Sequence, residues 1–233
     1  MIIKGLQKMT LLDFPGRVAA TVFTPGCDFR CPFCHNASLV MDEGDDIIEP
    51  QEVLDLLKKR RGMITGLAVT GGEPLLQPDL ADFLAEVKAL GAAVKLDHNG
   101  SFPGKLEELI KAGLVDYVAM DIKNCRERYA ETCGLPESAS EGVLANIDRS
   151  IGILRSSGVE HEFRTTVVRE LHSAEDIAAM GEWMKGDDAF FLQGFVDSGD
   201  IIRPGLSAYS RDEMQALLEI LRRYLPKAEL RGV

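Results

Sequence analysis

Three cysteines stand close together near the N-terminus, in the segment Cys27-Asp-Phe-Arg-Cys31-Pro-Phe-Cys34-His35-Asn36. Thiolates at these spacings can bind three irons of a cube-shaped iron–sulfur cluster, whose protein ligands are usually four cysteines. The next cysteines, Cys125 and Cys133, stand far along the chain. Three ligands leave one iron open, and an open iron can bind an external molecule and act as a reaction site.

Three other types of site use part of this pattern. The stretch Cys31-Pro-Phe-Cys34-His35 fits the covalent haem attachment sequence, but such attachment belongs to exported proteins, and residues 1–8 have no apolar signal core. A zinc site needs four ligands, and the nearest candidates are Cys125 and Cys133. A thiol redox pair would leave Cys27 without a role. The iron–sulfur cluster is therefore the preferred interpretation, and a zinc-stabilised binding protein is the alternative outside enzymes.

The cysteine pattern, with Phe33 before its last member, resembles the signature of radical S-adenosylmethionine (SAM) enzymes. The resemblance implies a 4Fe-4S cluster held by Cys27, Cys31 and Cys34, with the amino and carboxylate groups of SAM on the open iron. An electron from the reduced cluster would cleave the sulfonium and give a 5'-deoxyadenosyl radical, so the protein holds and orients its cofactors. Phe33 and Asn36 are expected to pack against the adenine edge and the loop.

A Gly-Gly-Glu sequence follows the second predicted strand. Paired glycines allow a ligand to approach the backbone, although glycine is also common in ordinary turns between strands and helices. In radical SAM enzymes such a motif contacts the amino end of SAM, and Gly71, Gly72 and Glu73 match it residue for residue. The Glu73 carboxylate would also favour the charged form of that amino group.

Polar side chains end the next two predicted strands, in Asp97-His98-Asn99-Gly100 and Met120-Asp121-Ile122-Lys123. These segments resemble glycyl-radical-enzyme activases, where they line a pocket for SAM and a peptide substrate. The resemblance implies that Asp97, Asn99 and Asp121 line the cofactor site and that Lys123 approaches the SAM carboxylate or the substrate backbone. Asp97 and Asp121 would share a monovalent cation as in the pyruvate formate-lyase activator, although His98 replaces the threonine found there. A purely structural ion pair between Asp121 and Lys123 is the alternative.

Two side chains on later strands complete the candidate set. Arg164 lies in an apolar run and needs a partner, because burying an isolated charge is costly. The resemblance makes SAM that partner. Gln193 has an amide that can donate and accept hydrogen bonds toward the ribose or adenine, and a satisfied core amide is the alternative. Arg169 and His172 belong either to the pocket or to a solvated loop.

Residues 11–36 are similar to activating proteins of anaerobic ribonucleoside-triphosphate reductase, and the resemblance covers nearly the whole chain. It implies that a glycine Cα of the partner reductase loses a hydrogen atom and keeps a stored glycyl radical, with 5'-deoxyadenosine and methionine as the other products. A low-potential donor such as flavodoxin or ferredoxin would supply the electron. An activator of pyruvate formate-lyase or of another glycyl radical enzyme would share every motif. A small-molecule enzyme such as 7-carboxy-7-deazaguanine synthase would share the cluster and the Gly-Gly-Glu sequence.

Secondary-structure elements must position these residues. Short apolar runs alternate with longer segments whose apolar residues repeat with a helical period, and this pattern predicts βα units and a parallel sheet. The βα units number six, fewer than the eight of a closed TIM barrel. We therefore expect an α/β fold with a partial (β/α)6 TIM-like barrel and chemistry at the carboxyl ends of its strands. Strands are expected at 18–24, 66–70, 93–97, 117–122, 162–168 and 189–196, and helices at 51–60, 78–90, 105–112, 142–156, 174–185 and 210–224. Residues 1–20 should form a hairpin that leads into the first strand, and residues 24–40 the cluster loop.

Composition limits the possible functions. The 233-residue chain, with 45% hydrophobic residues, is long enough for one large domain that spans residues 1–233. Its net charge of -11 argues against a phosphate-binding surface and hence against nucleic acid as a partner. The odd count of cysteines without an export signal indicates a reducing cytoplasm, in which Cys125 and Cys133 would be incidental thiols. No apolar run reaches the roughly 18 residues of a membrane span, and the acidic residues 42–46 are expected in a solvated loop.

Overall fold

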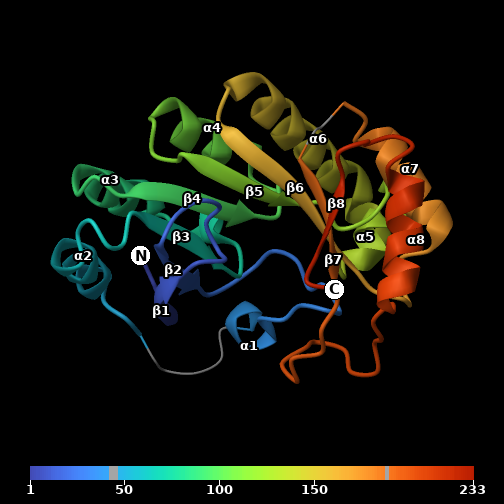
Figure 1. Ribbon diagram of the computed structural model, residues 1–233, viewed down its shortest axis with the longest axis horizontal. Helices are drawn as coiled ribbons and strands as arrows, with labels where there is room; N and C mark the ends of the chain where they lie inside the picture. The colour runs from blue at the N-terminus through green and yellow to red at the C-terminus, as the bar shows by residue number, and fades with distance from the viewer. Residues whose placement is uncertain (42–46, 187–188) are drawn as a thin grey trace.

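The computed structural model of the protein describes residues 1–41, 47–186 and 189–233, so the predicted acidic loop at 42–46 lies outside the described residues. One eight-stranded sheet forms the centre, in the order β1-β2-β3-β4-β5-β6-β7-β8 (Figure 1). Its strands are β1 Gly5–Thr10, β2 Ala19–Thr24, β3 Gly66–Gly71, β4 Ala93–His98, β5 Tyr117–Asp121, β6 Glu160–Val167, β7 Phe190–Gly194 and β8 Glu229–Arg231. The strands β2 to β8 run parallel, whereas β1 is antiparallel to β2. Order in space follows order in sequence, as in a barrel of successive βα units.

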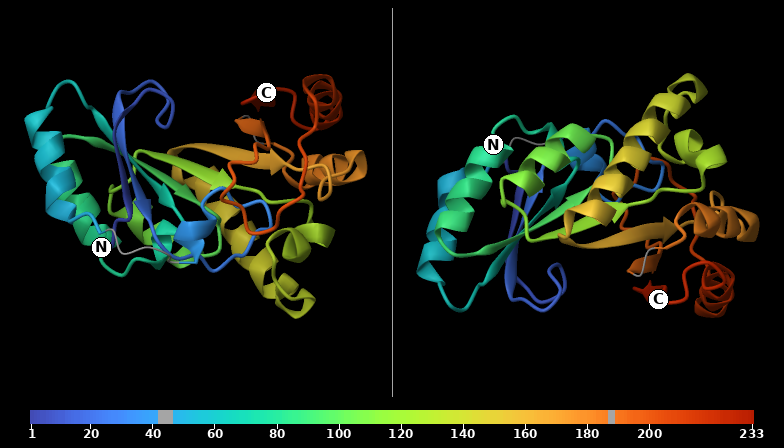
Figure 2. Two further views of the ribbon diagram at one scale, coloured as in Figure 1. Left: turned by 90° about the horizontal axis from the view of Figure 1, so that it is seen from below. Right: turned by 90° about the horizontal axis from the view of Figure 1, so that it is seen from above.

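Helices cover the outer side of the curved sheet, and the two views in Figure 2 show them outside the strands. The longer helices are α2 Pro50–Lys59, α3 Leu80–Ala89, α4 Pro103–Lys111, α6 Ser140–Ser157, α7 Ala174–Trp183 and α8 Arg211–Leu221, and the short ones are α1 Ala37–Val40 and α5 Tyr129–Thr132. Ser173 and Ser210 begin α7 and α8 with capping boxes, in which each side chain accepts from the backbone N–H three residues on. These caps fix where the last two long helices start.

The structure confirms the predicted α/β fold with a partial TIM-like barrel. Each predicted strand and helix is present, with ends displaced by at most three residues, and the hairpin expected at the N-terminus is the β1–β2 pair. The strand β8 was not predicted, because three residues are too few to show a period. Among the described residues, no helix is long and apolar enough to cross a membrane.

Polar and aromatic side chains fill the barrel at the amino ends of its strands. The Tyr117 hydroxyl donates to Glu162 at 2.8 Å, and Arg231 donates to the same carboxylate at 2.7 Å. Phe14, from the turn between β1 and β2, packs on the Tyr117 ring at 6.1 Å between centroids. Because alternate residues of a strand share a face, the same faces present Asp121 and Arg164 nearer the carboxyl ends. The barrel is therefore filled at one end and hollow at the other.

Candidate active site at the carboxyl ends of the strands

A cavity of about 260 Å³ opens at the carboxyl ends of the parallel strands. Every predicted site residue lines it except Glu73. The predicted residues in its lining are Cys27, Cys31, Phe33, Cys34, Asn36, Gly71, Gly72, Asp97, Asn99, Asp121, Lys123, Arg164 and Gln193. The structure thus brings together segments from five strands and from the loop after β2, although they are far apart in the sequence.

The loop between β2 and α1 carries the three cysteines. Its ends meet through a hydrogen bond from the Gly26 N–H to the Leu39 carbonyl at 2.8 Å. Within the loop, the Cys34 N–H donates to the Cys31 carbonyl at 3.0 Å, and the Phe29 N–H donates to the Cys27 sulfur at 3.4 Å. Backbone hydrogen bonds rather than regular secondary structure therefore hold the thiols in place.

The donor set fits an iron–sulfur cluster better than a single metal ion. Among the described residues, no three His, Cys, Asp or Glu side chains converge on a point where one ion would bind. A cube-shaped cluster binds each thiolate through a different iron, so its ligands need not converge. Burial raises the pKa of Cys27 to about 12. Metal binding displaces the thiol proton, so the free thiols of Cys27, Cys31 and Cys34 can serve as ligands of the cluster that the radical SAM pattern implies.

The turn at the end of β3, from Gly71 to Glu73, holds the cluster loop by direct backbone contact. The Gly72 N–H donates to the Thr24 carbonyl at 2.8 Å, and the Glu73 N–H donates to the Gly26 carbonyl at 2.7 Å. The Asn36 side chain adds a bond to the Gly71 carbonyl at 3.0 Å. Gly71 has φ +115°, a conformation that side chains rarely adopt. The Gly-Gly sequence and the cysteine loop therefore form one packed unit.

Replacement of Gly72 by alanine is expected to disrupt this unit. A Cβ at Gly72 would lie 1.9 Å from the Gly26 carbonyl oxygen, so one of the two backbones must move. We expect a Gly72→Ala protein to retain well under half of the wild-type iron and SAM cleavage after anaerobic reconstitution. The matched control is Gly152→Ala in α6, where a Cβ meets nothing within 4 Å and should stabilise the helix by up to about 1 kcal/mol. Wild-type iron content in the Gly72 variant would contradict the contact.

Glu73 occupies a different place from the one that the family resemblance implies. Its carboxylate is fully buried and accepts from the Leu75 N–H at 2.9 Å and from the Asn99 N–H at 2.8 Å. Burial raises the pKa of Glu73 to about 8, although both hydrogen bonds oppose the shift. Asn99 in turn donates its side-chain amide to Asp28 at 2.8 Å. Glu73 therefore connects the end of β3 to the end of β4 and positions Asn99 beside the cluster loop.

A buried network of ion pairs lines the same cavity as the cysteines. Arg164 donates to Asp121 at 3.0 Å and to Asp97 at 3.3 Å. Lys123 pairs with Asp121 at 2.9 Å, and Lys95 pairs with Asp97. The protein partners of Arg164 are thus two aspartates, where the sequence analysis expected SAM. Both carboxylates assigned to a monovalent cation are likewise occupied by cationic side chains.

Electrostatics keep this network charged. Burial alone would raise the pKa of Asp121, but Arg164 and Lys123 outweigh it and hold that pKa well below its usual range. Burial likewise opposes the charge of Lys123, and Asp121 and Cys31 raise the lysine pKa in spite of it. Two carboxylates face three cations, so the network as a whole carries one excess positive charge. An anionic group such as a carboxylate would complete it.

Arg169 and His172, which the sequence assigned either to the pocket or to a solvated loop, do not line the cavity. Arg169 is exposed and pairs with Glu213 on α8. His172 is buried beneath the site, where its Nε2 lies 2.8 Å from the Lys123 carbonyl, so it supports the segment that carries Lys123. Gln193 on β7 lines the cavity as predicted.

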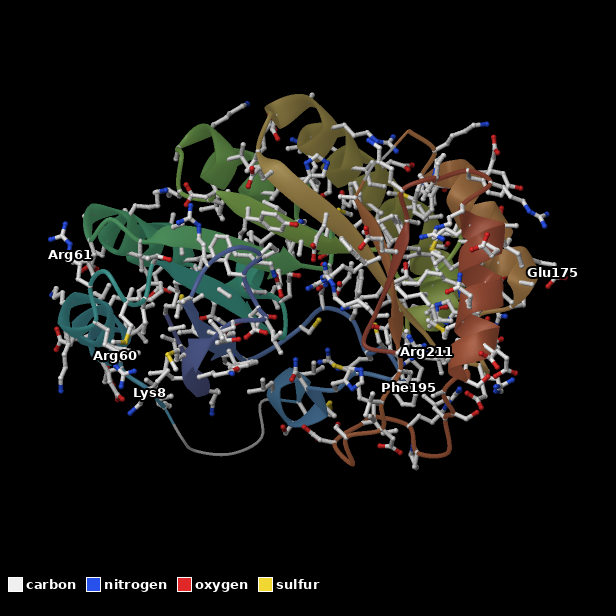
Figure 3. The ribbon with its side chains drawn as sticks, in the orientation of Figure 1. Lys8, Arg60, Arg61, Glu175, Phe195 and Arg211 are labelled. Atoms are coloured by element: carbon white, nitrogen blue, oxygen red, sulfur yellow. The ribbon has the colours of Figure 1, made fainter. Side chains whose placement is uncertain are left out.

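Several lining residues were missed in the sequence. Phe29, Val40, Thr70 and Thr166 line the cavity, and His35 packs on Phe195, which Figure 3 labels, at 5.6 Å between ring centroids. Thr166 could have been predicted from the sequence, because it stands two residues after Arg164 and must share its face of β6. The others depend on loop packing, for which the sequence carries no period.

Comparisons with known proteins agree with this site. The family described as the Radical SAM superfamily matches residues 21–181. A putative glycyl-radical enzyme activating enzyme of Methanocaldococcus jannaschii is 30% identical over 237 residues, which cover 100% of this chain and 96% of the relative. A pyruvate formate-lyase-activating enzyme of Clostridium pasteurianum is 34% identical over 127 residues, or 52% of each chain.

Solved structures agree on the fold. The crystal structure of Streptococcus suis SuiB bound to the precursor peptide SuiA superposes with a TM-score of 0.69 at 16% identity, over 91% of this chain and 48% of SuiB. The chain thus spans about half the length of this structural neighbour, and the likeness concerns the fold alone. The cofactors of the superfamily are a 4Fe-4S cluster and SAM. The three cysteines and the ion-pair network that line the cavity provide suitable groups for them. This chain therefore belongs to the radical SAM superfamily, in its group of glycyl-radical-enzyme activating proteins.

Proposed function

We propose that this protein activates anaerobic ribonucleoside-triphosphate reductase by generating a glycyl radical on it. The observation that carries the radical chemistry is the cavity that brings together the three thiols and the positive ion-pair network. A glycyl-radical activating relative aligned over the whole chain supports a protein substrate. The reductase rather than another partner rests on the sequence likeness of residues 11–36.

Each wall of the cavity has a separate binding task. Cys27, Cys31 and Cys34 would hold the cluster, and the Gly71–Gly72 backbone would present polar groups to the amino end of SAM. The excess positive charge around Arg164 suits the SAM carboxylate, because an opposite charge nearby favours the ionised form. When bound, the cluster and SAM supply the radical that removes a hydrogen atom.

The remaining lining residues would orient the nucleoside and the peptide. Gln193 can donate and accept toward the ribose or adenine, with Phe33 and Asn36 nearby in the cluster loop. Lys123, two residues after the end of β5, lines the cavity and could donate to a backbone carbonyl of the partner's glycine-bearing loop. The reaction consumes one electron from a low-potential donor such as flavodoxin or ferredoxin. Its products would be methionine, 5'-deoxyadenosine and the partner's glycyl radical.

Electron paramagnetic resonance would test the proposal directly. Reconstituted, reduced protein is mixed with SAM and, in parallel, with anaerobic ribonucleotide reductase or pyruvate formate-lyase from the same source. We expect a persistent glycyl doublet with the reductase that disappears without SAM. A doublet that forms with pyruvate formate-lyase and not with the reductase would identify pyruvate formate-lyase as the partner. Formation of 5'-deoxyadenosine without any doublet would instead indicate a small-molecule radical SAM enzyme.

A further inference from the structure

Asn99 is the first residue after β4, and its side chain lies against the cluster loop. The residue is buried and lines the cavity, and the Glu73 carboxylate accepts from its backbone N–H at 2.8 Å. The sequence analysis placed Asn99 in the cofactor site by resemblance alone. In the structure, the hydrogen bonds of its side chain run to Ser101, Asp28 and Cys27. Asn99 therefore contacts one of the three predicted cluster ligands directly.

Ser101 fixes which way the Asn99 amide faces. The Asn99 Oδ1 accepts from the Ser101 backbone N–H at 2.9 Å and from the Ser101 hydroxyl at 2.6 Å. A backbone N–H can only donate, so the amide atom that faces it must be the oxygen and not the nitrogen. Both residues are buried, so water does not compete for these bonds. The amide nitrogen of Asn99 must therefore point away from Ser101, toward the cluster loop.

The two hydrogens of the Asn99 amide nitrogen meet two acceptors on that loop. The nitrogen donates to the Asp28 Oδ1 at 2.8 Å and to the Cys27 Sγ at 3.8 Å. An amide NH₂ group has no acceptor lone pair to offer, so the direction of both bonds is fixed whatever the state of the sulfur. The Cys27 Sγ and the Asp28 Oδ1 lie 3.9 Å from each other. The amide thus offers one N–H to the sulfur and one to the carboxylate beside it.

We propose that Asn99 is a positioning residue that holds the Cys27 ligand through its amide N–H and raises the reduction potential of the cluster bound there. Hydrogen bonds to the sulfurs are one of the factors that set cluster potentials. A donor at the sulfur offsets negative charge, and the reduced cluster carries one more negative charge than the oxidised one. Groups that orient a metal ligand also tune the metal. The inference rests on the proposed cluster site but not on the identity of the partner.

Potentiometric titration of the reconstituted protein, followed by electron paramagnetic resonance of the reduced cluster, would test this role. We expect Asn99→Ala to shift the midpoint potential to a more negative value, so that the ratio of reduced to oxidised cluster at a fixed potential falls severalfold. Asn99→Asp should shift it further, because a carboxylate replaces the donor with a negative charge. The matched control is Ser101→Ala, which removes one of the two donors to Oδ1 and leaves both bonds of the amide nitrogen in place. The control should keep the wild-type midpoint.

The outcomes separate this inference from the proposed function. An Asn99→Ala protein with the wild-type midpoint would overturn the inference and leave the cluster site intact. An equal shift in Ser101→Ala would also overturn it, because the cause would then be a loosened turn after β4 and not the lost donor. If the alanine variant assembles no cluster, an unchanged midpoint in Asn99→Asp, which keeps the acceptor for Ser101, has the same effect. A wild-type protein that assembles no cluster would remove the site and the inference together. The expected shift in a protein that activates no partner would support the inference and overturn the proposed function.

Discussion

Replacement of Cys34 by alanine is expected to abolish both cluster assembly and SAM cleavage. Each of the three thiols would bind a different iron, and two thiolates do not hold the cube. Iron and sulfide content after anaerobic reconstitution should fall to the background of the assay, and 5'-deoxyadenosine should not form.

The control for Cys34→Ala is Cys125→Ala, which removes a buried thiol that does not line the cavity. That variant should keep its full iron content and its cleavage rate. Normal cleavage in the Cys34 variant would refute the ligand assignment. Loss of cleavage in both variants would indicate that general destabilisation, and not a missing ligand, is the cause.

Replacement of Arg164 by leucine is expected to destabilise the fold by about 1.5–3 kcal/mol at neutral pH, the size of a lost hydrogen bond to a charged group. The guanidinium lies between Asp97 and Asp121 in the barrel. Its removal leaves the two carboxylates with only lysines as partners. Each carboxylate then keeps the free-energy cost of its burial but loses an ion pair that offset part of that cost. Urea unfolding followed by circular dichroism would measure the change in the free energy of unfolding.

The pH dependence of this loss identifies its origin. The pKa of Asp121 lies below its unfolded value in the native protein, so the carboxylate contributes stability above the unfolded pKa and loses it as the pH falls further. In the Arg164→Leu variant, Asp121 loses one of the two cations that hold its pKa down, so it takes up a proton nearer its ordinary pKa of about 4 and at higher pH than in the wild type. The gap between wild type and variant should therefore narrow below that pH. A gap that stays constant from neutral to acid pH would contradict the electrostatic explanation.

An exposed pair provides the control for Arg164. Arg169 on the surface pairs with Glu213, and both side chains are more than one-third exposed, at 42% and 43%. Solvent screens such a pair, so Arg169→Leu should change the unfolding free energy little. A comparable loss in both variants would mean that the shortened side chain, and not burial of the charge, determines the effect.

The sequence was sufficient for the barrel and for most of the cavity lining. The apolar runs locate the parallel strands, and their carboxyl ends share one rim, so Asp97, Asp121 and Arg164 had to meet there. The role of Glu73 was not predictable, because its two acceptor bonds depend on how the ends of β3 and β4 approach each other. The hydrogen bond from the Arg30 N–H to the Cys133 carbonyl depends on the packing of a four-residue helix, too short to leave a periodic signal.

The backbone contact between Gly72 and Gly26 has a consequence for protein engineering. The cysteine loop and the Gly-Gly-Glu turn cannot be exchanged separately, because each is shaped by the main chain of the other. A graft of the cysteine loop onto another barrel would need residues 24–40 and 70–75 as a single cassette. The smallest transferable unit therefore consists of two segments from adjacent strands. A library that varies only one segment will contain many sequences that cannot pack against the unchanged backbone of the other.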